Sequence, residues 1–208
     1  MRNTTLTTSF LTAVAVGIGL SATAPALAMD SLCQSLLSQK SILMKKPFHL
    51  YMTSEQKFTS ANLAKAANSL GMAGVKVSEE IWTGKDVYVQ TDGKWIDMQT
   101  SYAQMAKNTA DAANDPDIKK MRDAEKCSQL PDAVAFGQPA AVYQTSNSES
   151  GITNKIWISK SSHLPLKSEM HNDSGAMKEF TSSRYEYTNT QAPAGAISMK
   201  QMMQRHKH

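Results

Sequence analysis

The sequence predicts an α+β fold in which a long, curved antiparallel sheet carries a few short helices. Runs that alternate apolar and polar residues dominate from Val75 to Tyr187, and this alternation is typical of strands. Short turns separate most of these runs, which favours antiparallel pairing between neighbours. Only a few stretches have helical periodicity, and no linker or internal repeat divides the chain. We therefore expect a single domain.

The N-terminal segment has the features of a cleavable secretory signal. Arg2 provides the positive charge, residues 10–20 are apolar, and Ala26-Leu27-Ala28 offers a cleavage site. About 11 apolar residues are too few for a membrane anchor, which needs about 20. Cys33 lacks the residues that precede a lipid-attachment cysteine. We therefore predict a signal peptide over residues 1–28 and an exported, soluble protein, periplasmic if the source is a Gram-negative bacterium.

Two cysteines, Cys33 and Cys127, lie in the part predicted to be exported. An even number of cysteines in an oxidising compartment predicts a disulfide. It would join the first helix to the middle of the chain. A redox pair is the alternative, but no Cys-x-x-Cys spacing supports it.

The first half of the exported chain is expected to contain two helices and four strands. Asp30–Gln39 starts with an N-cap candidate and repeats leucine at helical spacing. Ser60–Leu70 has an apolar helical stripe that ends at Gly71. An Asp-Gly turn between two alternating runs is a strong hairpin signal. The strands predicted in this half are Pro47–Phe58, Val75–Trp82, Asp86–Gln90 and Lys94–Met98.

A helical interruption separates these strands from a second set. Tyr102 and Met105 begin a stripe of apolar and small residues at helical spacing, and Asp117–Lys126 predicts another short helix. The stripe can pack on the sheet or form a movable cover over a cavity, and the sequence leaves both open. After Cys127 the predicted strands are Ala140–Thr145, Thr153–Ser159, Leu164–His171 and Met177–Tyr187.

The charge of the chain argues against a nucleic-acid binder. The formal net charge is +4, and it falls to +3 when Arg2 is removed with the signal. Several of the remaining cations lie in the last residues, so the body of the domain is close to neutral and lacks an evident basic face. We expect residues 194–208 to form a flexible basic tail.

The sequence gives little support for catalysis. Its five histidines form no helical zinc-binding pair, and His163 and His171 would lie at opposite ends of one strand. No nucleophile elbow or phosphate-binding glycine loop is present. We therefore predict a protein that is not an enzyme and has no metal or cofactor. The 13 methionines suit either an adaptable surface for apolar ligands or an ordinary core.

Two hairpins resemble those of the outer-membrane lipoprotein carrier (LolA/LolB-like) superfamily. The first is Asp86–Trp95. The second, Lys155–Glu169, contains Trp157-Ile158-Ser159 and His163-Leu164-Pro165-Leu166-Lys167, with His163 where the family usually has glycine. The signal peptide without a lipid-attachment cysteine makes the chain similar to the soluble branch of the family. The resemblance implies a single domain over residues 29–193, built as a half-open β-barrel with helices covering its concave face.

What the resemblance implies about function is non-enzymatic binding of a lipid acyl chain or another hydrophobic small molecule in that half-barrel. The alternative is an envelope protein-interaction or stress-sensor module on the same fold, with no transported ligand. The residues predicted to contact a ligand, each of which could equally be core, are Trp95, Tyr102, Met105, Trp157, Leu164, Leu166 and Met170.

Overall fold

The computed structural model of the chain describes residues 31–36, 46–69, 74–91, 93–101, 104, 107–108, 111, 114–173, 175–199 and 201, without the side chains of residues 117, 118 and 121. The predicted signal peptide, Tyr102 and Met105 lie outside the described residues.

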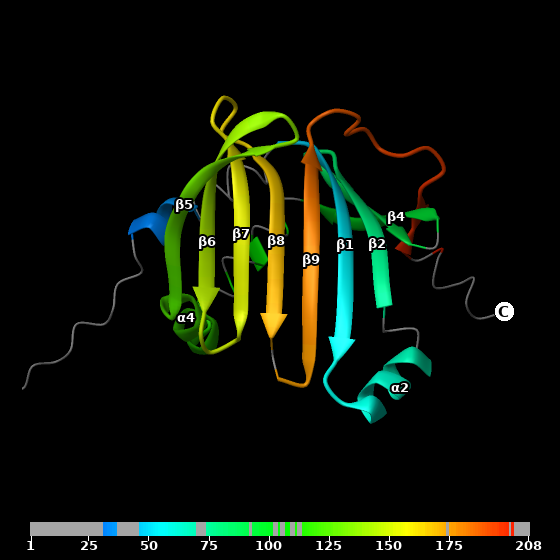
Figure 1. Cartoon of the computed structure of the whole chain (residues 1–208). Coiled ribbons are helices and arrows are strands. Elements are labelled where there is room, and N and C mark those ends of the chain that lie inside the picture. The colour runs from blue at the N-terminus through cyan, green and yellow to red at the C-terminus, as the bar shows by residue number, and fades with distance from the viewer. Residues whose placement is uncertain are drawn as a thin grey trace, which may run out of the picture.

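The described chain forms one ten-stranded sheet with the order β10-β4-β3-β2-β1-β9-β8-β7-β6-β5 (Figure 1). Neighbouring strands pair antiparallel, except β10, which pairs parallel with β4. The strands are β1 (Phe48–Phe58), β2 (Gly74–Trp82), β3 (Asp86–Thr91), β4 (Lys94–Ser101), β5 (Glu125–Ala135), β6 (Gln138–Asn147), β7 (Ile152–Ser159), β8 (Pro165–Asp173), β9 (Met177–Glu186) and β10 (Ile197–Ser198).

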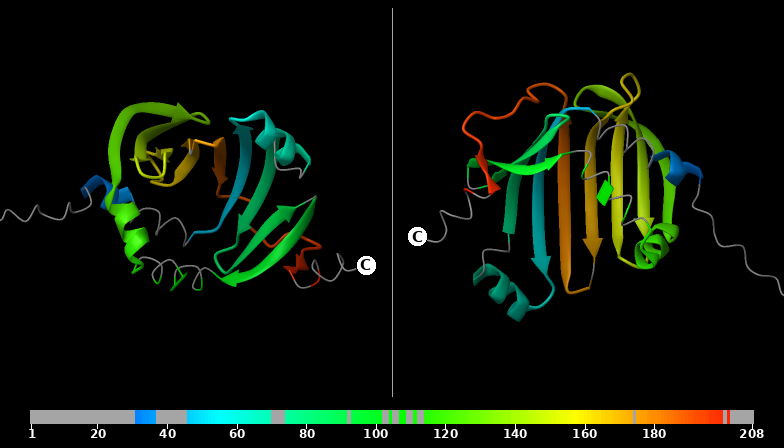
Figure 2. Two further views of the ribbon diagram at one scale, coloured as in Figure 1. Left: turned by 90° about the horizontal axis from the view of Figure 1, so that it is seen from below. Right: turned by 180° about the vertical axis from the view of Figure 1, so that it is seen from behind.

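The sheet is strongly curved and does not close into a barrel (Figure 2). This agrees with the predicted curved antiparallel sheet. Helix α2 (Ala61–Ser69) lies beyond the end of β1, and helix α4 (Pro116–Asp123) lies beside the β5 edge. In the described residues, the helices are therefore not shown to cover the concave face.

The register divides the sheet into two faces, which we name after neighbouring residues of β1. The Phe48 face carries Leu50, and the paired Tyr185 of β9 lies beside it. The Tyr51 face carries Tyr51, which pairs with Arg184 of β9. Because side chains alternate along a strand, residues on opposite faces point away from each other, and they can line one cavity only at an end of the sheet.

An aromatic cluster forms the main core on the Phe48 face. Phe48 is only 2% exposed and stacks on Trp82 with ring centroids 5.2 Å apart. Leu50 and Val87 complete the buried cluster, and the ring of Tyr185 lies 5.8 Å from that of Phe48. The apolar side chains of this part of the sheet therefore bury one another.

The disulfide between Cys33 and Cys127 is present, with the two Cα atoms 5.3 Å apart. Cys33 belongs to the helical residues 31–36, and Cys127 lies near the start of the edge strand β5. The Cys33 side chain is buried, and its Sγ lies 3.7 Å from the carbonyl oxygen of Glu125. The predicted link between the first helix and the middle of the chain is confirmed.

The prediction fails in three places. Strand β5 was missed, because Pro131 and a register shift between Leu130 and Ala133 interrupt its alternation. The helix predicted to reach Lys126 ends at Asp123, because β5 begins at Glu125. The tail expected from Ala194 onward contains β10, whose Ile197 pairs with Ile96 of β4.

Candidate functional site

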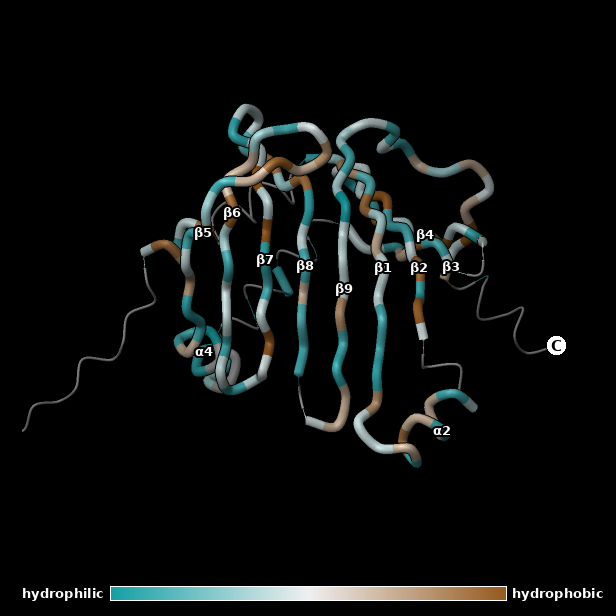
Figure 3. Tube along the Cα trace, viewed as in Figure 1, coloured by the Kyte–Doolittle hydropathy of each residue, from teal (hydrophilic) through white to brown (hydrophobic). Residues whose placement is uncertain are grey.

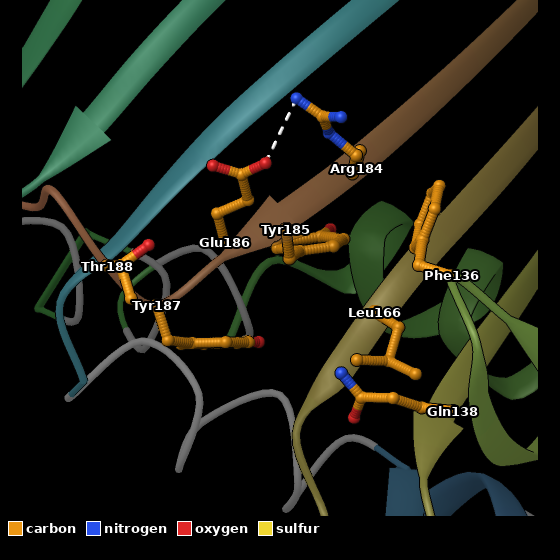
Figure 4. A pocket seen from close by; sticks show the side chains of 8 residues that line it. All are labelled: Phe136, Gln138, Leu166, Arg184, Tyr185, Glu186, Tyr187 and Thr188. Carbon is orange, nitrogen blue, oxygen red and sulfur yellow. Dashed lines mark ion pairs between the residues drawn. The ribbon is translucent and has the colours of Figure 1, made fainter.

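A pocket of about 350 Å³ opens where β8 and β9 meet the turn between β5 and β6 (Figure 4). Its lining combines apolar and aromatic side chains with one ion pair. The lining residues are Phe136, Gln138, Leu166, Arg184, Tyr185, Glu186, Tyr187 and Thr188.

A two-residue turn brings Phe136 to the pocket. Ala135 pairs with Gln138, so Phe136 and Gly137 alone connect β5 to β6. Both have positive φ, 49° and 76°, as a type I′ turn requires. Glycine adopts this conformation without cost, whereas a bulky side chain at positive φ is strained. Phe136 is also 57% exposed. The turn therefore keeps an aromatic residue at the rim although its positive φ is unfavourable and its apolar side chain is exposed to water.

A bulge places Leu166 in the pocket. Trp157 pairs with Lys167 and Ile158 pairs with Pro165, which leaves Leu166 as an extra residue in β8. Leu166 is buried against Ala135 and Ala140 of the β5–β6 hairpin, with Trp157 packed beside them. This second cluster therefore ties the hairpin to the strands that form the floor of the pocket.

The polar part of the lining comes from β9. Arg184 and Glu186 are two residues apart and form an ion pair with 3.0 Å between the Arg184 guanidinium and a Glu186 carboxylate oxygen. Arg184 also lies over the ring of Tyr51, 4.4 Å from its centroid. Both charged side chains are partly exposed, so they can contact the polar end of a ligand while remaining hydrated.

Two tyrosines close the pocket next to the core. The Tyr187 hydroxyl donates a hydrogen bond of 2.7 Å to the carbonyl oxygen of Pro165. The Tyr185 hydroxyl lies 3.4 Å from that of Ser168. Burial raises the pKa of both phenols above the ordinary value of 10.0, with a further raising contribution to the Tyr187 pKa from Tyr185.

These pKa shifts predict a loss of stability at high pH. Above about pH 10 the unfolded chain releases phenolic protons that folded Tyr187 retains, so stability should fall as the pH rises. In urea unfolding between about pH 8 and 11, Tyr187→Phe should show a shallower fall than wild type. Parallel curves for the two proteins would mean that Tyr187 does not contribute to this pH dependence.

The structure separates the predicted ligand contacts. Trp157 pairs with Lys167 on the Tyr51 face, and Trp95 lies on that face with its ring 6.0 Å from that of His49. Met170 pairs with Thr181 on the Phe48 face, so its side chain points away from the face that carries the two tryptophans. Leu164 is half-buried just before β8, and Leu166 lines the pocket.

Sequence reasoning missed the other lining residues, Phe136 above all. The sequence does contain a signal for the turn that carries Phe136. Two residues between Ala135 and Gln138 can form a hairpin turn, and Gly137 is typical of its second position. The ends of β8 and β9 are far from this turn in sequence, so nothing local indicated that they meet.

Among the described residues, no group of three or more histidine, cysteine, aspartate or glutamate side chains is arranged to hold a metal ion. In the same part of the chain, no helix is long and apolar enough to cross a membrane.

No protein-family model matches the sequence, and no curated protein matches it. Among solved structures, the chain is similar to the Pseudomonas aeruginosa MucA/MucB complex, with 14% identity and a TM-score of 0.38 over 83% of this chain and 60% of the other. It is also similar to LprF from Mycobacterium bovis, with 10% identity and a TM-score of 0.37 over 82% and 98%.

A putative outer-membrane lipoprotein-sorting protein domain from Vibrio parahaemolyticus shares 10% identity, with a TM-score of 0.28 over 84% of this chain and 98% of that domain. The chain spans about 60% of the length of the MucB structure it matches. Because these TM-scores are low, we interpret the site from its own residues.

Proposed function

We propose that this protein is a non-enzymatic binding protein of the periplasm that holds the apolar part of a lipid or other hydrophobic ligand in the pocket beneath the β5–β6 turn. The observation that carries the proposal is the strained and exposed Phe136 at the rim of a pocket that combines apolar and aromatic side chains with polar ones. Strain that a fold retains in an exposed turn is a reason to look for function there.

The size and chemistry of the pocket support a small apolar ligand. Ligand sites are concave and mostly apolar, carry a few polar groups, and usually measure about 300–1,000 Å³. The present cavity is near the lower end of that range. It therefore suits one acyl chain or a compact apolar group better than a whole lipid.

The Phe48 face supports the choice of this pocket over the middle of the sheet. Phe48, Leu50, Trp82 and Val87 are packed against one another and are almost fully buried. Farther along the same face, the paired row of Met170, Thr181 and Ser54 is mainly polar. Neither region offers an open apolar surface comparable to the pocket rim.

The ion pair at the rim gives the pocket a polar end. Arg184 and Glu186 lie on the Tyr51 face, whereas Leu166 and Phe136 provide apolar contact. An amphiphile with its chain against Leu166 and its head group near Arg184 would satisfy both parts of the lining.

Replacing Phe136 with asparagine tests the proposal by separating stability from binding. Asparagine tolerates positive φ and forms a favourable Asn-Gly turn with Gly137, so Phe136→Asn should raise the unfolding free energy by about 1 kcal/mol. The same change removes the aromatic rim and should weaken binding of a dansyl-labelled undecanoic acid about tenfold, as measured by fluorescence titration.

Leu63→Gln is the matched control, because Leu63 is another exposed apolar side chain (45%) but lies on α2. Its binding should equal that of wild type. If wild type fails to bind the probe, or Phe136→Asn binds it as tightly, the pocket is not a ligand site.

A different feature favours the second candidate function, a protein-interaction module. Val75 and Val77 are exposed on β2, where part of the strand has no outer neighbour in the described chain. A ligand site and an interaction surface can coexist, because the two features lie on different strands.

A further inference from the structure

The outer edge of the first part of β2 is open. β2 pairs along its length with β1, but β3 pairs with β2 only at Glu80, Ile81 and Trp82. Residues 74–79 therefore have one strand neighbour within the described chain. Figure 1 shows the lower end of β2 extending below the level of β4.

The backbone groups of alternate residues point outward along this stretch. The amide of Thr83 donates to the carbonyl oxygen of Asp86 across the β2–β3 junction, at 3.0 Å. In an antiparallel ladder, the N–H and C=O of every second residue point to the same side. Thr83 and Ile81 therefore direct their backbone groups toward β3. Two residues apart along the same strand, Glu79, Val77 and Val75 direct theirs toward the open edge.

The side chains on the edge are unusually apolar for an exposed strand. Val75 is 65% exposed and Val77 is 74% exposed, and both lie on the Tyr51 face. The hydropathy view shows this hydrophobic segment near the lower end of β2 (Figure 3). A long apolar edge is a template for pairing with another chain unless something blocks it.

The other strands at the margins of the sheet are blocked in visible ways. β5 contains Pro131 and a register shift, and the disulfide attaches the helix of residues 31–36 near its start. β10 is only two residues long. Proline, bulges and short length are the usual means of preventing edge pairing. Residues 74–79 contain no proline and no bulge, and the charge of Lys76 is the feature there that can oppose edge pairing.

Lys76 determines which partner the edge can accept. It lies between the two valines on the Phe48 face, where it pairs with Ser54 of β1. Two copies of this edge that paired around Lys76 would place like charges opposite each other, which is unfavourable. A partner strand with a carboxylate opposite Lys76 would instead form a favourable pair of opposite charges.

We propose that residues 74–79 bind an extended segment of another polypeptide, which adds a strand to the sheet and has an acidic residue between two apolar residues. The apolar residues lie against Val75 and Val77, and the acidic residue faces Lys76. Main-chain hydrogen bonds to the outward groups of the edge provide affinity, and the alternating side chains provide selectivity. This surface is separate from the pocket, so the proposal goes beyond ligand binding.

Binding is tested with a short fluorescein-labelled peptide in which valine alternates with threonine and one central threonine is replaced by glutamate. Fluorescence anisotropy should show binding to the purified protein, and hydrogen exchange should show new protection at Val75 and Val77. A peptide with lysine instead of glutamate should bind about three- to fivefold more weakly, as a cross-strand charge pair predicts.

Two variants make the test specific. Val77→Pro removes an outward N–H without removing a bond to β1, and proline is tolerated at an edge, so it should weaken peptide binding about tenfold while the protein stays folded by circular dichroism. Val77→Thr keeps the N–H and should lose less affinity. Lys76→Glu should reverse the preference and favour the lysine peptide.

The result that overturns the proposal is an absence of peptide binding and of protection at Val75 and Val77. Equal binding by Val77→Pro and wild type would also overturn it, because the backbone of the edge would then not be used. If wild type dimerises in sedimentation and Val77→Pro does not, the occupant is a second copy and the proposed partner is wrong.

Discussion

Replacing Cys33 and Cys127 together with alanine is expected to lower the free energy of unfolding by about 4 kcal/mol. The bond closes a loop with a sequence separation of 94 residues, and in the chain-entropy model a loop of about 100 residues contributes about 4–5 kcal/mol. Because the two cysteines join the helix of residues 31–36 to β5, the loss should also free that helix from the sheet edge. Equilibrium urea unfolding of the double variant measures the change.

Wild-type protein treated with a reductant provides the control, because it breaks the same bond without changing the sequence. It should unfold at the same urea concentration as the double variant. A difference of less than about 1 kcal/mol between oxidised and reduced protein would contradict the view that the bond restrains the unfolded chain.

Truncating the centre of the aromatic cluster should have a comparable effect. Phe48→Ala is expected to lower the unfolding free energy by about 3–5 kcal/mol, the usual result for a buried phenylalanine. Phe48 is 2% exposed, stacks on Trp82 and contacts Tyr185. Its loss therefore leaves a cavity among side chains from three strands. Thermal and urea unfolding both measure the change.

The matched control removes the same side chain from an exposed position. Phe136→Ala deletes an equal volume, but Phe136 lies at the pocket rim and is mostly exposed. Its unfolding free energy should change by less than about 1 kcal/mol. Equal losses in the two variants would show that the Phe48 cluster is not the main core.

The sequence was sufficient to predict most of the sheet, because its strands obey local rules. β1, β2, β3 and β9 were all expected within a few residues of their bounds, and each has clear alternation. β5 was missed where Pro131 and the bulge after Leu130 interrupt that alternation. His163 replaces the glycine that the family resemblance expects, and it adopts the φ of 58° that a glycine would favour.

The candidate site was harder to predict, because it depends on which strands become neighbours and on the face each residue occupies. Leu166 was expected as a ligand contact, and a bulge brings it to the pocket. Trp157 and Met170 belong to neighbouring strands, but the register places them on opposite faces. Phe136 meets β9 only through the curvature of the β5–β6 hairpin, which no local pattern encodes.

Photo-crosslinking with a diazirine-labelled fatty acid tests the central claim most directly, because it reports where the ligand lies. After irradiation and proteolysis, mass spectrometry should find the label on residues 136–138 and 184–188, which line the pocket. Phe136→Asn should reduce the labelling of both segments, and Leu63→Gln should not. Labelling centred on Met170, or on Leu50 and Val87, would contradict the proposed site. So would labelling that excess unlabelled fatty acid cannot displace.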